Sequence, residues 1–120
     1  VMDENFLATG KQEPYPLDGT KLHLTHNIFD KDAIILSNTG FKAVISTDKD
    51  SEKIEVEYPD TQYCAVWHKI KMEVPFVCIE PWTSLPGVSG KITALEEKED
   101  YNVLAGGSYK EHHLNITIIK

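Results

Sequence analysis

The sequence has few features of a membrane, exported or nucleic-acid-binding protein. It contains no run of about 18 apolar residues that would span a bilayer. The opening VMDENFLATG lacks the basic and apolar regions of a signal peptide. Positive charge is scarce, because 12 Lys and Arg residues face 19 Asp and Glu residues, for a net charge of -7. Such a surface repels nucleic acids and anionic membranes, so we expect a cytoplasmic protein with a neutral ligand.

Cysteine is rare, and several motifs of catalysis are absent. Cys64 and Cys78 both lie among apolar residues, where free thiols behave as small hydrophobic side chains, so we expect no disulfide. The sequence contains no phosphate-binding loop, no nucleophile elbow and no CxxC pair. The five histidines do not have the spacing of a metal site. We therefore expect neither a metal nor a cofactor.

Helical periodicity and internal repeats are also absent, which excludes solenoids and coiled coils. From residue 33 onward, runs of β-branched and aromatic residues alternate with turn clusters, which is typical of an antiparallel all-β protein. The expected strands cover residues 33–36, 41–47, 54–58, 63–69 and 75–82, with a final strand around 113–118. Residues 1–22 carry scattered Gly and Pro and are expected to form an irregular arm.

Three details of this pattern predict how the strands are arranged. The segment 37–40 separates the first two strands and contains Gly40, which can adopt positive φ, so a hairpin is expected there. The strand 75–82 is apolar on both faces up to Glu80, so Glu80 is expected to end a central strand. In the final strand the residues expected to face inward are Leu114, Ile116 and Ile118.

Glu80 is the strongest candidate for chemistry. It lies between Ile79 and Pro81 after an apolar run, where desolvation would favour the protonated carboxyl and make Glu80 a usable general base. From the pattern alone, the alternative is a solvated or salt-bridged glutamate at a strand end. Trp67 and Trp82 offer flat apolar faces that stack on sugar rings, and the alternative for both is a place in the core.

Other polar residues are weaker candidates. Asp30 and Asp32 precede an apolar strand, where they either bind a ligand or stabilise a turn. His26 and His68 are candidates for polar ligand contacts, although most of the histidines are expected at the surface. The charge run at 96–100 is interpreted as a solvated turn without chemistry.

Several segments resemble one known family. They are HNIFDKDAIILSN (26–38), YCAVWHK (63–69), PFVCIEPWTSLPG (75–87) and the ending VLAGGSYKEHHLNITI (103–118). These segments resemble the aldose 1-epimerase (mutarotase) family of the galactose mutarotase-like superfamily, particularly its LacX-like branch. The resemblance extends from about residue 20 to the end of the sequence, and FVCIEPW is its most specific motif.

The resemblance implies a fold and a mechanism. The family fold is an antiparallel β-sandwich of roughly 250 to 300 residues, so residues 1–120 would supply the C-terminal strands of one domain. Glu80 would take the proton from the anomeric hydroxyl of a hexose of the glucose or galactose type, while a histidine protonates the ring oxygen. Asp30 or Asp32 would bind sugar hydroxyls. The acid histidine lies N-terminal to these residues in the family, so the N-terminal portion of the same protein is the expected partner.

Two other functions remain open from the sequence. One is a non-catalytic carbohydrate-binding β-sandwich, in which Trp67 or Trp82 is the stacking platform. The other is a phosphosugar epimerase, which needs a basic cluster at the site. The residues available for such a cluster are His68, Lys69 and Lys71.

Overall fold

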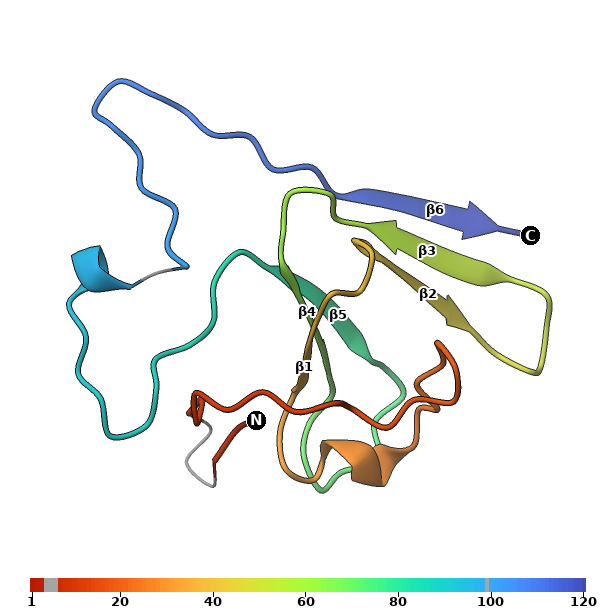
Figure 1. The fold of residues 1–120 in the computed structure, drawn as a ribbon. Helices are drawn as coiled ribbons and strands as arrows, with labels where there is room; N and C mark the ends of the chain where they lie inside the picture. Colours follow the sequence, from red (N-terminus) through yellow and green to blue (C-terminus); the bar gives the residue numbers. More distant parts are fainter. Residues whose placement is uncertain (4–6, 99) are drawn as a thin grey trace.

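The computed structural model describes residues 1–3, 7–98 and 100–120, and it confirms the all-β class (Figure 1). The strands are β1 (Ile34–Ser37), β2 (Lys42–Ser46), β3 (Lys53–Glu57), β4 (Tyr63–Trp67), β5 (Cys78–Trp82) and β6 (Asn115–Ile119). Two short 3-10 helices, η1 (His26–Phe29) and η2 (Leu95–Glu97), accompany them. None of the helices in the described ranges could span a bilayer.

The strands form two antiparallel three-stranded sheets. One has the order β1-β4-β5 and the other the order β2-β3-β6. In the first sheet, Ala65 at the centre of β4 lies between Ile35 of β1 and Glu80 of β5. The second sheet places Val56 of β3 between Ala43 of β2 and Ile116 of β6.

The predicted hairpin between the first two strands is wrong. β1 pairs with β4 and β2 pairs with β3, so these two strands belong to different sheets. Between them, Asn38, Gly40 and Phe41 all have positive φ, at 57°, 70° and 61°. Three left-handed residues within four positions turn the chain sharply, and here they lead it from one sheet into the other.

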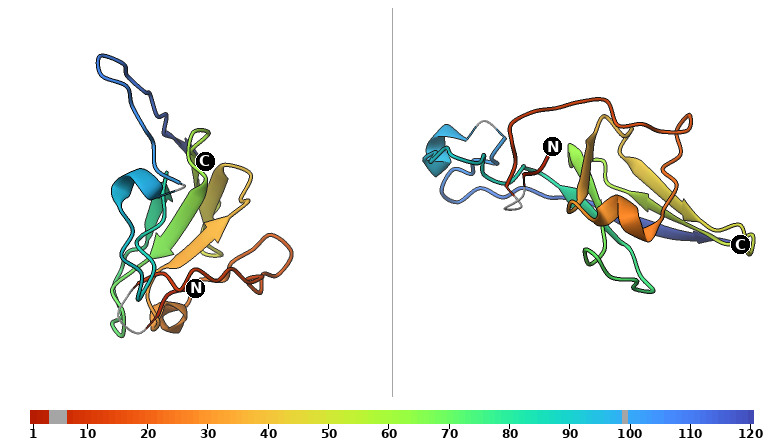
Figure 2. Two further views of the ribbon diagram at one scale, coloured as in Figure 1. Left: turned by 60° about the vertical axis from the view of Figure 1, so that its left-hand side comes forward. Right: turned by 90° about the horizontal axis from the view of Figure 1, so that it is seen from below.

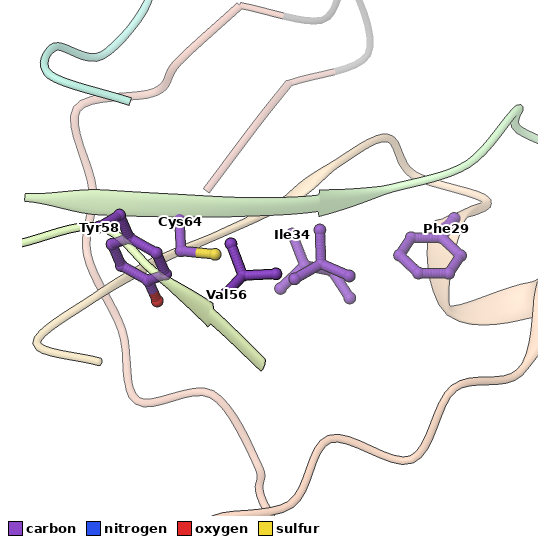
Figure 3. Close-up of a cluster of buried hydrophobic side chains, with 6 residues drawn as sticks. Phe29, Ile34, Val56, Tyr58 and Cys64 are labelled. Atoms are coloured by element: carbon purple, nitrogen blue, oxygen red, sulfur yellow. The ribbon is translucent and has the colours of Figure 1, made fainter. Parts of the chain in front are cut away.

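The hydrophobic core lies between the two sheets (Figure 3). Its buried residues are Phe29, Ile34, Val56, Tyr58, Cys64 and Val66. Cys64 and Val66 alternate along β4, and Val56 comes from the facing sheet, as period-two patterning predicts. Tyr58 follows β3, and its buried hydroxyl donates to Oγ1 of Thr39 over 2.9 Å. The core is therefore tied to the turn that joins β1 and β2.

The second sheet is only partly covered by the described residues. Ile116 and Ile118 lie across from Val56 and Ile54 on the expected face, yet they are 64% and 66% exposed. Every residue from 101 to 120 is exposed, and Figure 2 shows the blue segment 101–114 before β6 projecting away from both sheets. The Cα radius of gyration is 16.1 Å, against roughly 14 Å for a compact domain of this length.

The N-terminal arm carries isolated bridges in place of strands. Ala8 pairs with Val88 in the loop that follows β5. Its N–H donates to the carbonyl oxygen of Gly87 over 3.2 Å, and its own carbonyl oxygen accepts from the N–H of Ser89 over 2.8 Å. These bonds hold the arm beside the β1-β4-β5 sheet, where it borders the candidate site.

Candidate functional site

Glu80 lies in the middle of β5, and β5 is an edge strand of its sheet. The expectation that Glu80 ends a central strand is therefore wrong. The strand continues through Pro81 because an edge strand tolerates a residue without an N–H, which can face away from its neighbour. Beyond β5, the described chain provides no further strand to this sheet. The half-buried Glu80 carboxyl is thus next to an open edge.

One face of this sheet brings three of the predicted site residues together. Side chains directly opposite in an antiparallel pair point to the same face, and so do residues two apart in a strand. By this register the face carries Tyr63, Ala65, Trp67, Cys78, Glu80 and Trp82. Trp67 lies across from Cys78, and Trp82 follows Glu80 by two positions. Glu80 is therefore surrounded by aromatic residues on its own face.

Glu80 has one hydrogen-bond partner in the described chain. The indole Nε1–H of Trp82 donates to Oε2 of Glu80 over 3.3 Å, and this contact is partly buried. The described residues provide no cation within salt-bridge distance of Glu80. The salt-bridge alternative is therefore absent there, and the second carboxylate oxygen is free to accept a proton or a hydrogen bond from a hydroxyl.

The three aromatic residues around Glu80 are half-buried. Trp67, Trp82 and Tyr63 are each partly exposed, so none of them is a fully enclosed core residue. A flat apolar ring with a polar tip packs against the apolar face of a sugar while the tip forms hydrogen bonds. This face therefore combines a carboxylate with surfaces suited to stacking.

The two aspartates lie apart from Glu80, before β1 at the opposite edge of the sheet. Asp30 is exposed and closes η1 through its N–H, which donates to the carbonyl oxygen of Asn27. Asp32 is half-buried and has a φ of 100°, an uncommon conformation for a residue other than glycine. It lines a groove of about 710 Å³ between the arm and β1, and this groove reaches Tyr63.

His68 belongs to the core side of the sheet. It is 3% exposed, and its ring packs edge-on against Phe29 with the centroids 4.4 Å apart. Nδ1–H donates to the carbonyl oxygen of Lys69 over 2.7 Å, which leaves Nε2 to accept from Nδ1–H of His26 over 3.3 Å. With both nitrogens bonded, His68 does not reach the face of Glu80. The basic cluster considered for a phosphosugar therefore lacks its histidine.

Lys98 and Asp100, in the charge run at 96–100, are half-buried and paired with each other, which differs from the expected solvated turn. Nζ of Lys98 lies 2.8 Å from Oδ1 of Asp100, and it also donates to the carbonyl oxygen of Leu85. Burial raises the pKa of Asp100, but the hydrogen bonds from Lys98 and from the N–H of Leu85 outweigh this and lower it below its usual value. The pair therefore anchors the loop that follows Trp82.

A polar cavity beside this face was not expected from the sequence. It has a volume of about 460 Å³. The residues that form its walls include Gln12, Ser37, Asn38, Phe41, Gln62 and Tyr63. Alternation along β4 already places Tyr63 on the face of Trp67 and was the one available signal. The amides come from the arm and from two separate turns, which no periodic pattern connects.

The site can serve acid–base chemistry on a neutral ligand that has hydroxyl groups and an apolar face. No group of three or more His, Cys, Asp or Glu residues that could hold a metal ion occurs within the described ranges. No family model, curated protein or solved structure matches the chain. We therefore infer function from the residues of this face.

Proposed function

We propose that the protein is an aldose 1-epimerase that binds a hexose on the face of Glu80, with Glu80 as the general base. The observation that carries the proposal is the hydrogen bond from Trp82 to Glu80 on an aromatic face. It holds a carboxylate without an ionic partner beside rings that can stack on a sugar. The segment FVCIEPW, which carries the resemblance to this family, includes both residues.

The proposed reaction begins when Glu80 takes the proton of the anomeric hydroxyl. The bond between C1 and the ring oxygen breaks as a histidine of the N-terminal portion protonates that oxygen, which leaves an open-chain aldehyde. Rotation about the C1–C2 bond presents the other face of the aldehyde to the returning hydroxyl. The ring then closes while Glu80 returns its proton and the histidine recovers its own, so the two groups exchange roles.

The proposal assigns substrate binding to the remaining residues. Trp67 and Trp82 stack against the sugar, since both lie on the face of Glu80 and stay partly accessible. Asp32 is better placed than Asp30 to accept hydrogen bonds from sugar hydroxyls, because it lines the groove that reaches Tyr63. Asp30 is exposed and closes η1.

The N-terminal portion of the same protein is the proposed partner. Support for it comes from two uncovered features of the described chain: the open edge of β5 and the exposed face of Ile116 and Ile118. A soluble domain normally pairs or covers such an edge and such a face. The proposal therefore predicts that residues 1–120 alone do not accelerate mutarotation.

Polarimetry of α-glucose and α-galactose tests the proposal. The complete protein should accelerate the approach to anomeric equilibrium in proportion to its concentration, while the 120-residue chain leaves the rate at that of buffer. If the complete protein leaves the rate unchanged for both sugars, the epimerase proposal is wrong.

A non-catalytic carbohydrate-binding protein is the second candidate. It is favoured by one observation, that within the described residues the face of Glu80 carries no histidine and no second carboxylate. Such a protein would bind sugar in a calorimetric titration but would leave the rate of anomer exchange unchanged at every protein concentration. The two measurements together separate the candidates.

A further inference from the structure

The cavity of about 460 Å³ adjoins the proposed sugar site. Ser37, Tyr63 and Trp82 occupy one row across the β1-β4-β5 sheet, since Tyr63 is the register partner of both. Ser37 and Tyr63 form part of the cavity wall. Tyr63 is also a diagonal neighbour of Glu80, and such residues lie about 7–8 Å apart on one face. A molecule bound at Glu80 can therefore reach the cavity by extending across Tyr63, which neighbours Glu80 and forms part of the cavity wall.

The walls of the cavity have the chemistry of a site for a neutral polyol. The residues lining it are uncharged, and the side-chain amides of Gln12, Asn38 and Gln62 have no hydrogen-bond partner within the described chain. An amide donates and accepts at once, as a sugar hydroxyl does. The rings of Tyr63 and Phe41 add flat apolar surface between the amides.

The cavity wall is held in shape from the core. Tyr58 is 1% exposed, its N–H donates to the carbonyl oxygen of Phe41 over 2.9 Å, and its hydroxyl donates to Thr39 over 2.9 Å. Phe41 is 53% exposed and has a φ of 61°, which is strained for a bulky residue. Strained backbone conformations of this kind cluster at active sites and ligand-binding sites.

We propose that this cavity is a second sugar-binding subsite, so that the ligand is a reducing disaccharide or a longer saccharide. The reducing unit occupies the face of Glu80, where the proposed function places the reaction, and the next unit lies beyond Tyr63 in the cavity. Gln62 and Asn38 bond its hydroxyls, and Tyr63 or Phe41 packs against its ring. The inference rests on the proposed function, because Glu80 must bind the reducing unit.

Calorimetric titration of the complete protein tests the subsite with glucose, galactose, maltose, cellobiose and lactose. At least one disaccharide should bind about tenfold more tightly than its own reducing unit, as expected for one or two added hydrogen bonds and a stacking contact. Gln62→Ala should remove most of this gain and leave monosaccharide affinity unchanged. Asn38→Gly should do the same, since glycine retains the left-handed backbone while the amide is lost. Asn115→Ala, an exposed amide on β6, is the matched control and should change neither affinity.

The outcomes distinguish the subsite from the proposed function. If monosaccharides bind and no disaccharide binds more tightly, the subsite is refuted and the proposed function stands. If a disaccharide is preferred but Gln62→Ala and Asn38→Gly retain the preference, the second unit lies elsewhere and the assignment to this cavity is wrong. If no sugar binds at all, both proposals are overturned.

Discussion

Trp82 and Glu80 are two positions apart on β5, and the indole Nε1–H of the first donates to Oε2 of the second over 3.3 Å. Residues two apart in a strand share a face, so the same tryptophan both borders the carboxylate and orients it. Pro81 between them fixes its own φ, which limits how the strand can move at this point. We infer that Trp82 is a positioning residue for Glu80 as well as a wall of the proposed sugar site.

Replacing Trp82 by Phe should separate these two roles. An aromatic ring remains at position 82, but the indole N–H donor is lost. We therefore expect kcat to fall and KM to change little, because the phenyl ring can still stack on the substrate. A hydrogen bond to a charged group contributes about 1.5–3 kcal/mol, so the expected loss in rate is roughly 10- to 100-fold. Trp67→Phe is the matched control, since Trp67 donates no hydrogen bond within the described chain. Equal losses in the two variants would contradict the positioning role.

Cys78 should report occupancy of the site. It is half-buried on the face of Glu80, whereas Cys64 is 2% exposed in the core. Iodoacetamide should therefore alkylate Cys78 in the native protein and leave Cys64 unmodified, as read by peptide mass spectrometry. Saturating sugar should slow the labelling. Labelling of Cys78 at the same rate with and without bound sugar would contradict this location of the site.

The sequence predicted the strands better than their partners. Runs of β-branched and aromatic residues between turn clusters predicted residues of every strand, and alternation within β4 put Trp67 with Tyr63 on one face, because these local patterns are set by burial. Pairing depends on how the turns direct the chain, and the left-handed φ of Asn38 and Phe41 was not evident from residue type. The hairpin was mispredicted for this reason.

The candidate site was predictable in the same uneven way. Glu80 and Trp82 share a face by their spacing alone, so their proximity follows from the sequence. The position of Glu80 at a sheet edge depends on the strand order β1-β4-β5. This order is set by contacts between residues far apart in the sequence, so a local pattern does not predict it. The place of His68 in the core likewise depends on its packing against Phe29, which lies in a different element.

Tyr58 should make the protein sensitive to alkali. Burial raises the pKa of Tyr58 from 10.0 to about 12 and also raises the pKa of the Cys64 thiol. The unfolded chain therefore loses these protons at lower pH than the folded chain, so stability declines as pH rises from about 10 toward 12. Tyr58→Phe should be less stable by about 1 kcal/mol at neutral pH, because its bond to Thr39 is lost.

Urea unfolding across this pH range tests whether Tyr58 causes the loss of stability in alkali. The stability of the native protein should fall more steeply with pH than that of Tyr58→Phe, which retains only the contribution of Cys64. Tyr109→Phe, at an exposed position, should follow the native curve. If the stability of the native protein and of Tyr58→Phe changed in parallel with pH, the pKa of Tyr58 would not be raised by folding.

Asp60 should stabilise the start of β6 in a pH-dependent manner. Its Oδ2 accepts from Nδ1–H of His113 over 2.7 Å and from the N–H of His113 over 2.8 Å, and these bonds lower the pKa of Asp60 below 3.8. The stabilising contribution is therefore present above pH 3.8 and is lost as the pH falls below it. Hydrogen exchange of the β6 amides should be faster in Asp60→Asn near neutral pH. Asp48→Asn, in an exposed turn, should exchange like the native protein.

Hydrogen exchange measured at acid pH decides whether Asp60 acts through its charge. The difference in exchange between the native protein and Asp60→Asn should shrink as the pH falls below 3.8 and through the lower pKa of the native Asp60, where its carboxyl becomes protonated. A difference that persists unchanged at lower pH would mean that Asp60 acts through shape and not through charge.

The most direct test of the central claim compares the complete native protein with Glu80→Gln by polarimetry of α-glucose and α-galactose. The amide keeps the size of the side chain and can still accept from Trp82, but it cannot take a proton, so mutarotation should fall by about 100-fold or more while sugar binding persists. Glu96→Gln, an exposed glutamate of η2, should leave the rate unchanged. If Glu80→Gln retains the native rate to within about twofold, Glu80 is not the base and the account of this site is wrong.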